Sequence, residues 1–61
     1  MLTILFVDDE PMLLEGLRRA LRGMRDAWNM LFATSGLEAL RLLEDRDVDV
    51  IVSDMRMPEL D

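Results

Sequence analysis

The sequence contains no cysteine and no histidine. Disulfide bonds and the usual zinc ligands are therefore absent. A chain of 61 residues buries only about 60% of its unfolded surface, and folds of this size often need disulfide bonds or a bound metal ion for stability. Catalysis by a cysteine nucleophile, a histidine base or a Ser-His-Asp triad is excluded within these residues.

Lysine is also absent, so the seven basic residues are all arginines; against 13 acids they leave a net charge of -6. A net acidic domain without a basic run is a poor binder of nucleic acid or of an anionic membrane. The apolar start, MLTILF, is too short to span a membrane and lacks the basic residues of a signal peptide. We therefore expect a cytoplasmic protein with no nucleic-acid or membrane partner. Its expected ligands are cations, or anionic groups that bind together with a cation.

What the sequence does contain is a regular alternation of apolar segments. Residues 2–7 (LTILFV) form a near-continuous apolar run, which is typical of a strand buried on both faces of a parallel sheet. Trp28 is expected to be a packing anchor. The periodicity predicts four further elements: a helix from residue 12 to about 25, a strand at 29–33, a helix from 36 and a strand at 50–53. This order implies right-handed βαβ crossovers and a parallel sheet.

Both predicted helices carry an apolar stripe, and the second follows a capping box made by Ser35 and Glu38. The predicted stripes consist of Leu13, Leu14, Leu17, Ala20, Leu21 and Met24 in the first helix, and of Gly36, Ala39, Leu40 and Leu43 in the second. The arginines of the first helix are expected on its outer face, where Glu15 can pair with Arg18 or Arg19.

Carboxylates follow two of the predicted strands. Asp8 and Asp9 come after the first strand, and Asp54 comes after the third. Parallel strands end at the same edge of a sheet, where ligands of open α/β sheets bind, so three carboxylates converge if these strands are neighbours. A hard cation such as Mg²⁺ would offset their repulsion, and one carboxylate could then attack a phosphoryl group. A plainer alternative also stands, in which Asp9 or Glu10 only caps the helix and Asp54 only forms a turn.

Three motifs, FVDDEP at 6–11, SGLEAL at 35–40 and VSDMRMPELD at 52–61, resemble the receiver domain of two-component response regulators, in register over residues 1–61. The resemblance implies an α/β fold: the βαβαβ half of a flavodoxin-like receiver domain, with a parallel sheet of order 2-1-3 and two helices. Residues 1–61 would be a truncated receiver domain, its N-terminal half. The family's switch Ser/Thr after strand four and its Lys after strand five have no counterpart here.

The same resemblance implies roles for single residues. Asp54 falls on the phospho-acceptor aspartate, which takes a phosphoryl group from a sensor histidine kinase. Asp8 and Asp9 fall on the acidic pair that binds Mg²⁺, Asp9 directly and Asp8 through water, and Arg56 falls where a backbone carbonyl contacts the metal. Pro58 matches the proline of the following loop. The implied function is that of a signalling phosphoprotein, not an enzyme beyond self-catalysed aspartate phosphorylation, with the transfer impaired in a half-domain.

Two functions of other classes stay open. The half-domain could be an assembly module without phosphotransfer, because its third strand, 50–53, is uncharged and would offer an open sheet edge. We expect a homodimer through that strand. A phosphotransferase or phosphatase with a DxD-type nucleophile is disfavoured, because Asp8 and Asp9 are adjacent. The properly spaced Asp47 and Asp49 precede a strand and are expected in a solvated loop.

Overall fold

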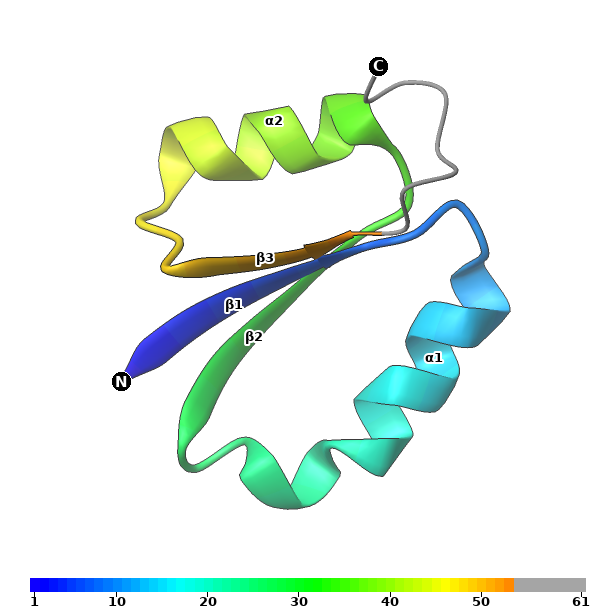
Figure 1. Ribbon diagram of the computed structural model, residues 1–61, viewed down its shortest axis with the longest axis vertical. Coiled ribbons are helices and arrows are strands. Elements are labelled where there is room, and N and C mark those ends of the chain that lie inside the picture. Colours follow the sequence, from blue (N-terminus) through cyan, green and yellow to red (C-terminus); the bar gives the residue numbers. More distant parts are fainter. Residues whose placement is uncertain (54–61) are drawn as a thin grey trace.

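The structure, a computed structural model, describes residues 1–53. Its elements are β1 (Leu2–Val7), α1 (Pro11–Ala20), the 3-10 turn η1 (Arg22–Met24), β2 (Trp28–Ala33), α2 (Gly36–Asp45) and β3 (Val50–Ser53). The strands form one parallel sheet in the order β2-β1-β3, with α1 on one face and α2 on the other (Figure 1). The predicted α/β fold and strand order are confirmed. No helix within this part of the chain is long and apolar enough to cross a membrane.

The central strand β1 is buried on both faces, which explains its unbroken apolar sequence. Leu5 is fully buried at 0% exposure. The core layer on the α2 side consists of Leu5, Val7, Ala33 and Ala39. The layer on the α1 side consists of Ile4, Phe6 and Leu14, with Trp28 among the half-buried residues packed against it. The two layers alternate along β1, as the period of two in a strand requires.

Helix α1 is shorter than predicted. It begins at Pro11 and ends at Ala20, and the chain then tightens into η1, where Met24 N–H donates to the Leu21 carbonyl at 2.8 Å. Short 3-10 turns are common at helix ends, and Gly23 is a poor helix former.

The prediction for the α1 stripe is right at its centre and wrong at its margins. Leu14 is buried, and Leu17 and Leu21 pack against the core. Leu13 is 52% exposed and Met24 is 37% exposed. Ala20 is also exposed.

Helix α2 begins as predicted. The Ser35 hydroxyl accepts a hydrogen bond from Glu38 N–H at 3.1 Å. The Glu38 carboxylate reaches one residue further back than a standard capping box requires and accepts from Thr34 N–H at 2.6 Å. These two bonds fix the point at which the chain leaves β2 and turns over the sheet.

The predicted inward face of α2 is wrong at two of its four residues. Gly36 and Ala39 are buried, but Leu40 is 57% exposed and Leu43 is 36% exposed. Leu42 packs against the core instead. The small residues Gly36 and Ala39 are the ones that lie against the sheet. This rotation of the helix turns Leu40 and Leu43 outward.

Strand β3 is bounded by β1 on one side, with Ile4 opposite Val50 and Val7 opposite Ser53. Its apolar residues Val50, Ile51 and Val52 are 41%, 51% and 47% exposed. No other strand of residues 1–53 lies beside it, so β3 is an edge of the described sheet.

Candidate functional site

The first candidate residue, Asp8, lies where β1 leaves the sheet. Its N–H donates to the Ala33 carbonyl at 3.1 Å, which extends the β1–β2 ladder one residue beyond the strand. Its Oδ1 accepts from Glu10 N–H at 2.9 Å. The side chain is buried, at 7% exposure. Asp8 therefore turns the chain from β1 into α1 through a bond to the backbone two residues on. Sequence reasoning missed this role, although an Asp two residues before a helix cap was a usable signal.

Asp9 and Glu10 are both exposed. Glu10 is the N-cap of α1, but its side chain makes no capping hydrogen bond. Its carbonyl instead accepts from Leu13 and Leu14 N–H, at 3.1 and 3.2 Å. The Asp9 carboxylate has no hydrogen-bond partner among residues 1–53. A purely capping role for these two side chains is therefore not what the structure shows.

The ends of β1 and β3 lie side by side, because Val7 pairs with Ser53 in the parallel ladder. The predicted site, which combines acids that follow the first strand with Asp54 after the third, requires these two strands to be neighbours. Asp54, Arg56 and Pro58 lie outside the described residues, so their predicted roles stay predictions. Within residues 1–53 alone, no three acidic side chains gather closely enough to hold a metal ion. The predicted three-carboxylate site depends on Asp54.

A small hollow of about 200 Å³ opens beside Asp8, between α1 and the ends of β1 and β3. Its lining consists of Phe6, Val7, Asp8, Leu13, Leu14, Leu17, Val52 and Ser53. Asp8 is the one carboxylate in this lining. The half-exposed Leu13 and Val52 border it from α1 and β3. Asp8 thus adjoins a mostly apolar hollow.

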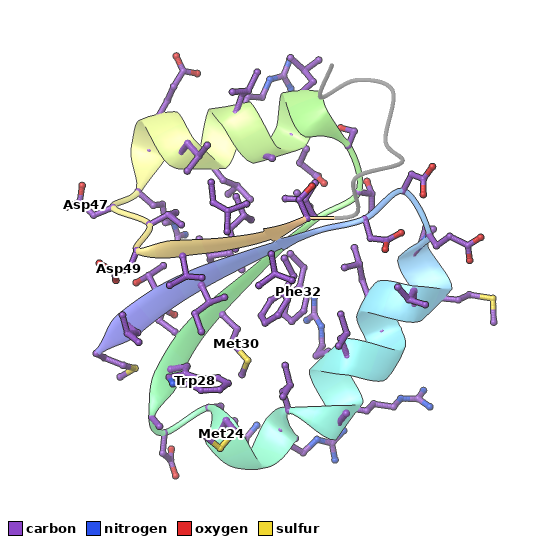
Figure 2. All side chains as sticks on the ribbon, in the orientation of Figure 1. Met24, Trp28, Met30, Phe32, Asp47 and Asp49 are labelled. Atoms are coloured by element: carbon purple, nitrogen blue, oxygen red, sulfur yellow. The ribbon has the colours of Figure 1, made fainter. Side chains whose placement is uncertain are left out.

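The two acids of the loop before β3 lie at the opposite end of the sheet. Figure 2 shows Asp47 and Asp49 where the chain enters β3. Asp49 Oδ2 accepts from Thr3 N–H at 2.8 Å, and Asp49 N–H donates to the Thr3 carbonyl at 2.9 Å. Asp47 is exposed, as expected for a solvated loop, but Asp49 extends the β1–β3 ladder. This structural use of Asp49 argues against a DxD nucleophile.

Known proteins provide an independent comparison. A family model described as "Response regulator receiver domain" matches residues 4–61. The transcriptional regulatory protein GlrR of Escherichia coli is 43% identical over 58 residues, which cover 95% of this chain and 13% of that protein. The positive alginate biosynthesis regulatory protein of Pseudomonas aeruginosa is 42% identical over 62 residues, which cover 98% of this chain and 25% of the regulator.

A crystal structure of an uncharacterized protein from Neptuniibacter caesariensis superimposes with a TM-score of 0.78 at 41% identity. The match covers 95% of this chain and 42% of the other. The chain thus spans less than half of each of these relatives. The agreement in both sequence and fold extends over nearly all of its residues.

Proposed function

Because the chain belongs to the response regulator receiver domain family, we propose that residues 1–61 act as the N-terminal half of a receiver domain whose Asp54 accepts a phosphoryl group. The donor would be the phosphohistidine of a sensor histidine kinase, and the transfer would take place in the cytoplasm. An Asp54 carboxylate oxygen forms the new bond to phosphorus while the bond from phosphorus to the imidazole nitrogen breaks. The aspartate is the nucleophile of its own modification, and no separate substrate is turned over.

The pairing of Val7 with Ser53 is the observation that carries this proposal. Asp8 and Asp9 follow Val7 in the sequence, and Asp54 follows Ser53. The acidic pair and the proposed acceptor thus belong to neighbouring strands that end together, at the edge where open α/β sheets bind ligands. If β2 lay between β1 and β3, the acidic pair and Asp54 would not follow neighbouring strands, and the proposal would lose this support.

The chemistry of the described carboxylates suits Mg²⁺, which prefers oxygen ligands and keeps several waters. Asp9 is exposed and has no hydrogen-bond partner among residues 1–53, so it is the proposed direct ligand. Asp8 commits Oδ1 to the backbone and retains its second oxygen for a water ligand of the ion. Asp54 and the backbone carbonyl of Arg56 complete the proposed protein ligands. The bound ion would neutralise charge on the phosphoryl group.

Phosphoryl transfer should be slow in the isolated 61-residue chain. The sequence contains no lysine, so the family's lysine contact to the phosphoryl oxygens cannot form within it. Loss of one such electrostatic contact costs about 2.7–4 kcal/mol of transition-state stabilisation in acyl transfer. We expect a loss of similar order here.

The test is phosphorylation by acetyl phosphate or phosphoramidate with Mg²⁺, followed by intact mass spectrometry. We expect slow addition of one phosphoryl group, abolished in Asp54→Asn and retained in Asp47→Asn, which removes the same charge from the far loop. Labelling that persists in Asp54→Asn would refute the acceptor assignment. Rapid, complete labelling of the wild type would refute the expected impairment.

The exposure of β3 favours a second candidate function, that of an assembly module. Its three apolar residues, Val50 to Val52, are between 41% and 51% exposed. Two copies could join their third strands antiparallel around a two-fold axis and form one six-stranded sheet. Such pairing requires no phosphoryl transfer, so the two functions can be tested separately.

A further inference from the structure

A groove of about 490 Å³ runs along β2, on the side of the sheet that faces α1. One wall is formed by three arginines from α1, η1 and the C-cap of η1: Arg18, Arg22 and Arg25. The other wall is formed by β2, with the alternate residues Trp28, Met30 and Phe32 and the intervening Asn29. Figure 2 shows Trp28, Met30 and Phe32 in a row along β2. The groove lies at the opposite edge from β3, so a strand added beside β3 would not extend the sheet over it.

The aromatic wall fixes the position of one arginine. The Arg18 guanidinium carbon lies 4.7 Å from the centroid of the Phe32 ring. Phe32 in turn stacks on the buried Phe6, with ring centroids 5.2 Å apart and planes inclined by 16°. Arg18 is exposed, as expected, but its guanidinium lies over Phe32 and does not pair with Glu15, for which Arg18 or Arg19 was the expected partner. A guanidinium held on a ring keeps its donors in place for an anion at little further entropic cost.

The other two arginines leave the groove positively charged. Neither Arg22 nor Arg25 forms an ion pair with a carboxylate in the described part of the chain. Residues 16–25 contain four arginines and no acid, in a chain whose net charge is -6. Glu15 and Glu38 line an adjoining hollow that shares Arg18 and Phe32. The acids therefore bound the groove at one end, and the end with Arg22 and Arg25 is free to receive an anion.

We propose that this groove binds an acidic peptide segment of a partner protein, one that presents an aromatic or large apolar side chain between carboxylates. The apolar side chain would lie against Trp28 and Met30. The flanking carboxylates would accept hydrogen bonds from the guanidinium groups, which match carboxylates in a two-pronged geometry. The site lies apart from the proposed acceptor edge and does not depend on phosphorylation.

The charge distribution favours a peptide over a nucleic acid. A long polyanion would gain from a few arginines but would also meet the acids that dominate the rest of the surface. The basic segment from Arg18 to Arg25 is also short, because it comprises only the end of α1 and the 3-10 turn η1 with its C-cap Arg25. A short acidic segment fits this stretch without extending over the acidic surroundings.

The experiment titrates the 61-residue chain with a synthetic peptide in which Asp and Glu flank one Phe. The peptide lacks Trp, so fluorescence and the indole N–H signal of Trp28 report on the groove. Replacing the Phe by Ser, or the acids by Asn and Gln, should each weaken binding by about tenfold, since the groove uses both features. Absence of any Trp28 response to the acidic peptide at millimolar concentration overturns the proposal.

Two matched double variants distinguish binding in the groove from a general effect of the protein's net charge. Arg22→Gln with Arg25→Gln should weaken peptide binding by about tenfold, whereas Arg41→Gln with Arg46→Gln removes the same charge from α2 and its C-cap and should leave binding unchanged. Circular dichroism checks that both variants remain folded, and added salt should weaken wild-type binding independently of any variant. Equal weakening in both variants, or tighter binding of a single-stranded oligonucleotide than of the peptide, overturns the proposal.

Discussion

Asp8 and Asp9 are adjacent in the sequence but have different surroundings. Asp8 is 7% exposed and bonds Glu10 N–H, so its removal would disturb the turn from β1 into α1 as well as any ligand site. Asp9 is exposed and has no hydrogen-bond partner among residues 1–53. Of these two residues, only Asp9 can therefore be replaced to test metal binding without altering the described hydrogen bonds of the fold.

The first prediction concerns Mg²⁺ binding by Asp9 and Asp54. Titration with Mg²⁺ should shift the amide NMR signals of residues 8–10, and the double variant Asp9→Ala, Asp54→Ala should lose this response because two proposed ligands are gone. The control is Asp45→Ala with Asp47→Ala, which removes the same charge near the opposite end of the sheet. If all three proteins respond equally, the ligand assignment is wrong.

At the residue scale, the sequence predicted the candidate site but not the contact between Arg18 and Phe32. The strand-end acids indicated a candidate site, because the alternation of elements predicts parallel strands that end at the same edge. The order 2-1-3, which makes β1 and β3 neighbours, was implied only by the resemblance to receiver domains. The contact between Arg18 and Phe32 was missed, because it depends on how closely α1 approaches an edge strand that is distant in sequence. That distance is set by packing of the core layers, which no local spacing encodes.

At the scale of elements, α2 shows what periodicity can and cannot predict. Its start was predictable because Ser35 and Glu38 have a fixed spacing. Its inward face was not, since a helix rich in leucine offers several overlapping stripes with nearly the same period. The structure selects the stripe with Gly36 and Ala39, whose small side chains lie against the sheet. Leu40 and Leu43 then point away from it, at 57% and 36% exposure.

The second prediction concerns the start of this helix. Ser35→Ala removes the hydroxyl that accepts from Glu38 N–H and should lower the free energy of unfolding by about 1 kcal/mol. Urea denaturation followed by circular dichroism measures the change. Arg41→Ala, on the exposed side of the same helix, should stay within about 0.5 kcal/mol of the wild type. A Ser35→Ala variant as stable as the control would show that the cap contributes nothing to the fold.

At the scale of the whole molecule, large apolar side chains are exposed on α1, α2 and β3. Leu37 and Leu40 on α2 are 59% and 57% exposed, Leu13 on α1 is 52% exposed, and β3 adds Ile51 at 51%. An isolated chain of 61 residues without disulfide bonds has little stability to spare. Within residues 1–53, β3 has no strand on its outer side and these leucines are exposed, and both features favour association with another surface.

The third prediction is that the isolated chain self-associates through β3. Joining two third strands would pair the outer edges of Val50 to Val52 and bring Ile51 and Val52 of the two copies together. Sedimentation at micromolar concentration should therefore give the mass of a dimer, with a fraction that rises with concentration. Ile51→Lys should shift the equilibrium to monomer, because it places a charge on the edge strand. Met12→Lys, at a position 85% exposed on α1, makes the same kind of change elsewhere and should not. A compact, folded monomer of the wild type at these concentrations would show that the half-domain is stable with its edge uncovered.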